Sequence, residues 1–357
     1  SCRPGRQWSE GKNAGMTSLT PSVPMKSTPD GPPAALTLLG AAFGTVTFIG
    51  VWSTLSPAAV CLTSIGACIS GAQQVEPLAI TILMMVASTF AFWIYSLRTI
   101  PSTGTSDPSI VDRLWSVAPP LYVVLWCCWS QKRSARMVSM TAVALLWGLR
   151  LTWNFWIKGG YSHGGEDYRW VVVRTWYKGC VWELFNFVFI CCFQQCLLLG
   201  FASPAAAAMT SSEEWATSDT LSLVLALLFL LGEAVADRQM LVYQTEKYKR
   251  RERGDAAGAY ARGFIETGLW AYSRHPNYFC EVCFWWAFYG FSIGATGMCV
   301  NWTLPGVVFL SGLFLAPKGS LALTEAISSA KYPAYAEYQA TVSAFVPWPR
   351  KSSAKMS

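Results

Sequence analysis

The sequence has little charge for its length. Charged residues make up 13% of the 357 residues, whereas hydrophobic residues make up 53% and aromatic residues 14%. Because a soluble domain carries about 25% charged residues, this balance predicts an integral membrane protein. The net charge of +7 is spread over loops and tails. There it is typical of membrane topology and lipid headgroup contact, and we expect no nucleic-acid binding.

Several familiar chemical motifs are missing as well. The two histidines, His163 and His275, are too few for a histidine-rich di-iron site, and no Cys-x-x-Cys pair recurs with histidine at zinc-ligand spacing. No Gly-x-Gly-x-x-Gly segment follows a strand, and there is no Walker or Gly-x-Ser-x-Gly motif. The glycines of 290–297 lie in an apolar run, where helix packing explains them better. We therefore expect no metal, and any nucleotide must bind within the membrane bundle itself.

Long apolar runs are what the sequence does contain. They predict an all-α fold, a polytopic transmembrane helix bundle of roughly seven or eight spans. A shorter run at 57–70 either re-enters the membrane or extends the first span, and the run at 117–130 is short unless residues 110–116 continue its helix. The predicted spans are 34–52, 78–97, 117–130, 137–157, 180–201, 219–236, 280–298 and 301–316.

Composition along the chain divides it into four parts. We expect residues 1–33 to be a disordered or targeting tail, 34–100 an N-terminal transmembrane region, 101–350 the main membrane domain and 351–357 a basic tail. The connections 158–179 and 237–279 are basic and flank a pair of spans, so both are expected on the cytoplasmic face. We expect a multi-pass protein of the endoplasmic reticulum or another endomembrane.

The densest group of polar residues lies in the segment 269–281, at the start of an apolar run. It contains Arg274, His275, Asn277, Tyr278 and Glu281. Charged groups are costly in a bilayer unless they meet a polar ligand or a water-filled pocket. Anchoring to headgroups is the simpler explanation for an isolated Arg-His pair, but five such groups within about two helical turns favour a functional site.

Helix geometry places these side chains relative to one another. Pro276 suits the first turn of a helix, where its missing N–H is not needed. A helix that starts there would direct free backbone donors, Arg274 and His275 toward the loop, an arrangement that suits an anion such as a phosphate. Asn277 and Glu281 are four residues apart, so they share a helix face.

Three further segments place polar residues against apolar spans on the same side. They are 108–116, which contains Asp112 and Arg113; Arg150 to Asn154 with the following segment 164–169; and 233–239. Each allows a simpler interpretation. Asp112 and Arg113 could form an interfacial ion pair, Arg150 could extend to the headgroups, and Glu233 could pair with a neighbouring helix.

Taken in order, these blocks resemble a membrane family of unknown function that is related to the C-terminal domain of the steroid 5-alpha-reductases (3-oxo-5-alpha-steroid 4-dehydrogenases). The resemblance extends over roughly residues 80–350, so the main membrane domain 101–350 is expected to be steroid-reductase-like. The matching blocks are 108–116, 147–154, 165–168, 233–239, 267–281 and 332–347.

The resemblance implies an NADPH-dependent reduction of a C=C bond conjugated to a carbonyl, in a lipid or steroid-like substrate. Asp237, Asn277 and Arg274 would contact the cofactor, and Glu233 and Arg150 are assigned to the same cofactor site.

The same resemblance assigns the catalytic positions. Tyr278 and His275 would line the pocket, and Glu281 would orient its neighbours. A tyrosine or a protonated carboxyl within hydrogen-bond reach could polarise the substrate carbonyl, and burial in low dielectric keeps a carboxyl protonated.

Two other functions remain open at this point. The Arg-His-Pro-x-Tyr motif at 274–278 is also similar to that of the isoprenylcysteine carboxyl methyltransferases, which would imply S-adenosylmethionine as cofactor. Asp237 with Arg238, together with Glu281, favours the reductase. A non-catalytic membrane or lipid-binding protein is the third possibility, which the charged groups in an apolar setting disfavour.

Overall fold

The computed structural model of the chain describes residues 77–351, apart from 101–103, 131, 162–165, 256 and 318. The predicted tail 1–33, the predicted span 34–52 and the apolar run 57–70 lie outside the described residues, as do residues 352–357. Within the described residues the chain is mostly helical. The one sheet there is a short antiparallel hairpin, in which β1 (Thr99–Ile100) pairs with β2 (Thr105–Ser106).

The helices follow one another with short connections. In chain order they are α3 (Pro77–Ser96), α4 (Ser109–Leu114), α5 (Ala118–Trp129), α6 (Ala135–Ile157), α7 (Tyr168–Trp176), α8 (Cys180–Phe185), the π-helical segment η1 (Asn186–Phe193), α9 (Gln194–Ala202), α10 (Pro204–Met209), α11 (Thr217–Glu252), α12 (Ala259–Arg262), the 3₁₀ turn η2 (Gly268–Ala271), α13 (Pro276–Thr296), α14 (Leu304–Leu315), α15 (Ser320–Lys331) and α16 (Tyr335–Thr341).

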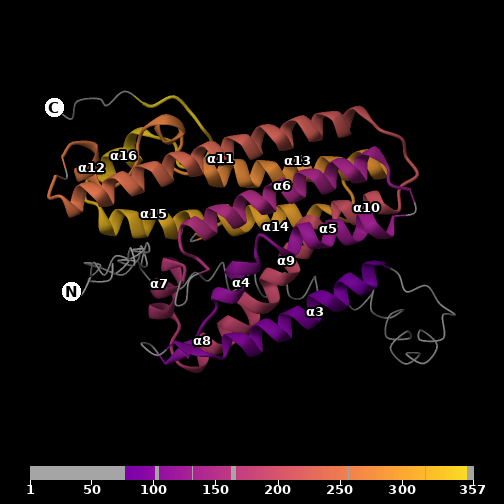
Figure 1. Cartoon of the computed structure of the whole chain (residues 1–357), viewed down its shortest axis with the longest axis horizontal. Coiled ribbons are helices and arrows are strands. Elements are labelled where there is room, and N and C mark those ends of the chain that lie inside the picture. The colour runs from indigo at the N-terminus through magenta and orange to yellow at the C-terminus, as the bar shows by residue number, and fades with distance from the viewer. Residues whose placement is uncertain are drawn as a thin grey trace, which may run out of the picture.

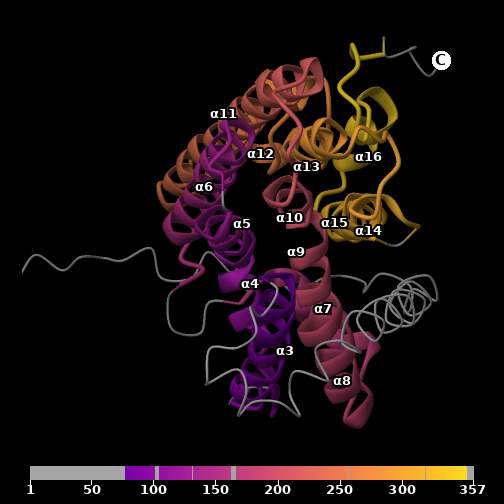
Figure 2. The same cartoon turned by 90° about the vertical axis from the view of Figure 1, so that its right-hand side faces the viewer.

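Figure 1 shows α6, α11 and α13 running side by side along the length of the molecule, with α3 on the opposite side of the bundle. Seen from the end, α9 and α10 lie between α5 on one side and α14 with α15 on the other (Figure 2). The described part of the chain therefore forms a helical bundle whose middle is occupied by α9 and α10.

Four helical segments in the described part of the chain are long and apolar enough to cross a membrane. They are Pro77–Ser96, Cys180–Met209, Thr217–Glu252 and Leu304–Lys331. These correspond to the predicted spans 78–97, 180–201, 219–236 and 301–316. The predicted number of seven or eight spans is not confirmed.

The remaining predicted spans in the described region differ from these four. Helix α5 covers the predicted span 117–130 with only 12 residues, and residues 110–116 do not continue it, because α4 ends at Leu114. Helices α6 and α13 contain 23 and 21 residues, but they carry charged side chains that face the interior of the bundle.

The close contact between α11 and α13 depends on glycine. A Cβ at Gly294 would lie 2.6 Å from Asp219 Oδ1, and one at Gly290 would overlap Ser222 Oγ. Since no real side chain fits at such distances, a residue larger than glycine would push the two helices apart. The prediction that the glycines of 290–297 serve packing is confirmed for Gly290 and Gly294, whereas Gly297 ends α13 with a left-handed backbone conformation.

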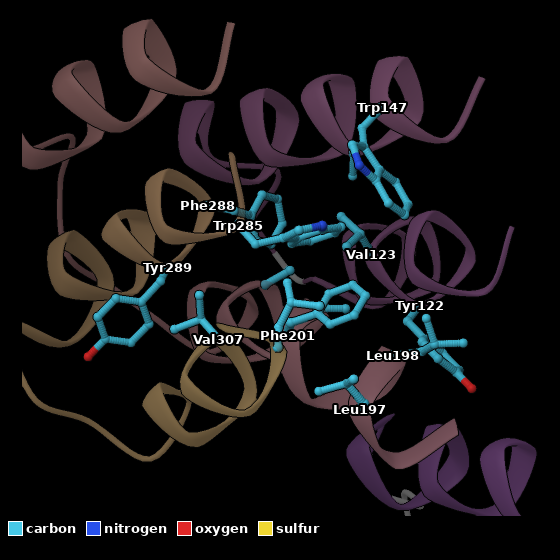
Figure 3. Packing of buried hydrophobic residues seen from close by; sticks show 14 of the residues in the cluster. Tyr122, Val123, Trp147, Leu197, Leu198, Phe201, Trp285, Phe288, Tyr289 and Val307 are labelled. Carbon is cyan, nitrogen blue, oxygen red and sulfur yellow. The ribbon is translucent and has the colours of Figure 1, made fainter. Parts of the chain in front are cut away.

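The core next to the site is built from aromatic side chains. Trp285 of α13 packs edge-on against Trp147 of α6, with ring centroids 4.8 Å apart, and tilted against Phe201 of α9 at 4.2 Å. Figure 3 shows these rings meeting between the helices, together with Phe288 and Val307. Such aromatic pairs add about 0.5–1.5 kcal/mol beyond their buried area, and here they hold together the helices that carry the charged side chains.

Candidate functional site

A cavity of about 280 Å³ lies between α4, α6, α7, α11, α13 and α15. One part of its wall is aromatic and aliphatic, and the other part is charged. Phe189, in the π-helical segment η1, belongs to the aromatic part. Five carboxyl side chains and three cations are among the described residues of the lining: Asp112, Asp167, Glu233, Asp237, Glu281, Arg150, Lys158 and Arg169.

Arg150 is the centre of the charged wall. Its guanidinium lies 2.6 Å from Asp237 Oδ2 and 2.7 Å from Glu233 Oε1, both on α11, and 3.6 Å from Glu281 Oε2 on α13. Asp237 also lies 4.0 Å from Lys158 Nζ. Arg150 therefore does not extend to the headgroups, and Glu233 does pair with a neighbouring helix, because both lie in one ion-pair network in the cavity wall.

Glu281 is oriented by two tryptophans. Trp147 Nε1 donates to Glu281 Oε2 and Trp285 Nε1 donates to Oε1, each at 3.0 Å. Indole N–H groups are donors only, so both carboxylate oxygens are held in fixed directions. The two tryptophans belong to the aromatic core, and packing of that core therefore fixes the position of a charged group in the cavity.

Asn277 and Tyr278 lie in the first turn of α13, which begins at Pro276 as predicted. Both line the cavity. Tyr278 Oη lies 3.2 Å from Thr324 Oγ1 of α15, and its ring stacks on His275 with centroids 5.2 Å apart. Asn277 Oδ1 is buried and has no hydrogen-bond partner among the described residues.

Glu233 has an unpaired atom as well. Its Oε2 is buried without a hydrogen-bond partner in the described part of the chain. Buried polar atoms in folded proteins are nearly always paired. Among the described residues, the unpaired acceptors Glu233 Oε2 and Asn277 Oδ1, and the unpaired donor Arg150 Nε, therefore point to a ligand that brings both hydrogen-bond donors and an acceptor to this wall.

Arg274 and His275 do not line the cavity. Arg274 Nη2 lies 2.6 Å from Glu325 Oε2, and its Nη1 donates to the carbonyl oxygens of Gln339 and Val342. His275 Nε2 lies 2.7 Å from Glu325 Oε1. The expected arrangement, in which these two side chains face an anion, is not what the structure contains, because Glu325 and the C-terminal segment already engage them.

The second charged part of the wall is formed by Asp112 and the start of α7. Trp170 Nε1 donates to Asp112 Oδ2 at 2.6 Å. Asp167 accepts two hydrogen bonds of 2.9 Å from the Arg169 guanidinium. Asp112 therefore bonds to Trp170 rather than forming the simple ion pair with Arg113 that the sequence allowed.

The two carboxyl groups titrate in opposite directions. Burial and, to a smaller extent, the nearby Asp167 carboxylate raise the pKa of Asp112 to about 7, against the opposing effect of the Trp170 hydrogen bond. Burial also acts to raise the pKa of Asp167, but the Arg169 guanidinium outweighs it and lowers that pKa below its ordinary value. Separated pKa values in one cavity are typical of acid–base chemistry.

Most residues of this site could be predicted from the sequence, but the pairing of Asp112 with Trp170 could not. Of the predicted site residues, Arg150, Glu233, Asp237, Asn277, Tyr278 and Glu281 line the cavity. Asp112 and Asp167 lie in segments that the sequence marked as polar, whereas Trp170 follows directly after one of them and was not predicted. The role of Asp112 depends on its contact with Trp170. Among the described residues there is no group of three or more His, Cys, Asp or Glu side chains that could hold a metal ion.

The fold and the site define a helical, membrane-type protein with a charged cavity between its helices. Residues 92–342 match the family described as protein of unknown function, DUF1295. This match spans more than half of the chain, and the protein belongs to that family. An uncharacterized protein of Schizosaccharomyces pombe is 36% identical over 262 residues, which cover 69% of this chain and 74% of that protein. No solved structure matches the chain.

Proposed function

We propose that this protein is an NADPH-dependent oxidoreductase of the membrane, which reduces a C=C bond conjugated to a carbonyl in a lipid-like substrate, as the steroid 5-alpha-reductases do. The observation that carries the proposal is the pair of unpaired acceptors, Glu233 Oε2 and Asn277 Oδ1. They line the cavity beside Tyr278, which is a donor suited to a carbonyl oxygen.

The residues of the cavity fit a nicotinamide nucleotide. Ribose hydroxyls and the carboxamide donate hydrogen bonds that Glu233 Oε2 and Asn277 Oδ1 could accept, and Arg150 Nε, unpaired among the described residues, could donate to an oxygen of the nucleotide. Asn277, Glu233 and Asp237 would hold that part of the cofactor, with Arg150 keeping the two carboxylates in place. Lys158, whose side chain is 39% exposed, is the cation that a phosphate would meet. When bound, the cofactor supplies the hydride.

The protein's own side chains would supply the rest of the chemistry. Tyr278 would donate to the substrate carbonyl and withdraw electron density from the conjugated double bond. His275 would hold the Tyr278 ring in position, because the two rings stack on each other. Glu281, held by two tryptophans, would keep Arg150 and the cofactor-binding carboxylates in position. The aromatic part of the wall suits an apolar substrate.

Nucleotide binding is the first test. Purified protein in detergent should melt at a higher temperature with NADPH, because a ligand that binds only the folded state stabilises it. Asn277→Ala should abolish most of the shift without lowering the melting temperature of the free protein, since Asn277 Oδ1 has no protein partner to lose. Gln244→Ala, on α11 but away from the cavity lining, is the matched control.

Turnover is the second test. NADPH oxidation would be followed with cyclohex-2-enone, β-ionone and cholest-4-en-3-one, three enones of increasing size. Oxidation that depends on the enone, and that is lost in Tyr278→Phe, is the expected result. An NADPH shift identical in Asn277→Ala and the unchanged protein, or no oxidation with any enone, would refute the proposal.

One observation favours the methyltransferase as a second candidate. The described lining contains five carboxyl groups but only three cations. An acidic cavity suits S-adenosylmethionine, whose sulfonium and ammonium groups are positive, better than it suits an anionic nucleotide. Thermal shifts measured with NADPH and with S-adenosylmethionine distinguish the reductase from the methyltransferase. Stabilisation by S-adenosylmethionine alone would indicate methyl transfer, and no shift with either ligand would favour a non-catalytic protein.

A further inference from the structure

Asp112 differs from every other carboxyl group of the cavity in its partners. It is placed by α4, the short helix before α5, and its Oδ2 accepts a 2.6 Å hydrogen bond from Trp170 Nε1 of α7. Trp170 is only 8% exposed, so its indole is held by packing. No ion pair joins Asp112 to a cation among the described residues, whereas Glu233, Asp237, Glu281 and Asp167 each have one.

The cations near Asp112 are engaged elsewhere. Arg169 binds both oxygens of Asp167, Arg174 is paired with Glu166, and Arg113 Nε donates to the carbonyl oxygen of Gly160 at 3.1 Å. A negative charge on Asp112 would therefore lie in the cavity wall without a counter-ion and close to another carboxylate. Such a buried charge is unfavourable, and the group takes up a proton instead.

The electrostatics agree with the geometry. The groups that act on Asp112 are Asp167 and Glu166, which favour its neutral form, and Arg169 and Trp170, which favour its charged form. Burial is the largest effect, and the resulting pKa is about 7. Near neutral pH a substantial fraction of Asp112 therefore carries a proton that is available to a bound molecule.

We propose that Asp112 is the proton donor to the substrate and that Trp170 is the residue that positions it. This inference rests on the proposed function. In the reduction, hydride adds to the β-carbon of the enone and the C=C π bond breaks. The O–H bond of Asp112 breaks and a C–H bond forms at the α-carbon. The substrate would gain two electrons and two hydrogens, with the hydride supplied by a bound nicotinamide nucleotide, and Asp112 would recover its proton from water.

The activity test compares three variants on the enone that the unchanged protein reduces. Asp112→Asn keeps an acceptor for Trp170 but cannot act as an acid, and kcat should fall by about 10²–10⁴-fold with the NADPH-induced thermal shift unchanged. In the unchanged protein kcat should decline as pH rises through about 7, because the acid form is then lost, and this decline should be absent in Asp112→Asn.

The two neighbours should move the pH profile in opposite directions. Trp170→Phe removes a hydrogen bond that favours the carboxylate, so the decline should shift to higher pH. Asp167→Asn removes a like charge and releases Arg169, so the decline should shift to lower pH. A merely structural role for Trp170 would change kcat at all pH values without this shift. Shifts in the reverse directions would overturn the assignment.

A measurement without substrate separates this inference from the proposed function. Infrared spectra of the protein in detergent should contain a carboxylic-acid C=O band that titrates near pH 7, vanishes in Asp112→Asn and persists in Asp167→Asn. If the unchanged protein reduces none of the three enones, the proposed function and the donor role both fail, although the band would still show that Asp112 is neutral. If Asp112→Asn keeps full activity or the band, the inference alone fails.

Discussion

Glu325 of α15 binds Arg274 and His275 at the same time, through its two carboxylate oxygens at 2.6 and 2.7 Å. Tyr335 Oη and Gln339 Nε2 donate to the same carboxylate at 2.6 and 2.8 Å. Glu325 thus joins the start of α13 to α15 and α16. Since Ser320 and Leu323 of α15 line the cavity, this cluster fixes one wall of the candidate site from outside it.

Substitution of Glu325 should therefore destabilise the fold. In Glu325→Gln the buried Arg274 guanidinium loses its counter-charge, and breaking a buried pair from one side costs about 3–5 kcal/mol. The melting temperature in detergent should fall by several degrees. Glu337→Gln is the matched control, because Glu337 pairs with Arg262 at 2.8 Å while its side chain is 61% exposed; exposed pairs contribute about 0–1 kcal/mol. Equal melting temperatures for the two variants would contradict a structural role for the cluster.

The opposite end of the bundle depends on Arg136. This side chain is 2% exposed, lies 2.8 Å from Asp219 Oδ2, and donates to the carbonyl oxygens of Glu213, Glu214 and Gly294. In Arg136→Met a fully buried Asp219 would be left without its cation, so the protein should lose about 3–5 kcal/mol of stability. The neighbouring Arg133→Met, at an exposed position, should change it by less than about 1 kcal/mol. Similar thermal or denaturant midpoints for both would show that the buried pair is dispensable.

Trp147→Phe tests the support of Glu281. The change keeps an aromatic ring but removes the N–H that donates to Glu281 Oε2. A buried charged acceptor that loses a donor costs about 2 kcal/mol, and the carboxylate becomes free to turn. We expect a lower melting temperature and a smaller NADPH-induced shift. Trp286→Phe is the control, because it removes an indole donor to Ser311 at a position that is 39% exposed, and it should affect neither quantity. A larger effect of Trp286→Phe than of Trp147→Phe would contradict the role of Trp147 in orienting Glu281.

The stability of the protein should depend on the charge of Asp112. Its pKa is raised from 3.8 to about 7 in the folded state, so the folded state binds its proton more tightly than the unfolded chain does. The stability that this proton provides is present in full below pH 3.8 and is lost as pH rises through about 7. Melting temperatures of the unchanged protein and Asp112→Asn, measured from pH 4.5 to 8.5, should therefore diverge. Parallel curves would mean that Asp112 is already charged in this range.

Local features of the site could be predicted because they depend only on neighbouring residues. Pro276 begins α13 because a helix tolerates proline in its first turn. Glu233 and Asp237 share a helix face because they are four residues apart, and this shared face lets one cation bind both. The partners of Arg274 and Asp112 could not be predicted in this way, because they lie 51 and 58 residues further along the chain. Which helix they meet depends on packing.

The sequence by itself determined that the chain forms apolar helices, which of their faces carry charge, and that the polar residues gather near one another. These properties follow from hydropathy and helical periodicity, which are local. Only the tertiary structure decided that Arg150 rather than Arg274 belongs to the cavity, and that Asp112 has an indole instead of a cation as its partner. In a low-dielectric interior the nearest counter-charge determines whether a group is ionised, and that distance is set by how the helices pack.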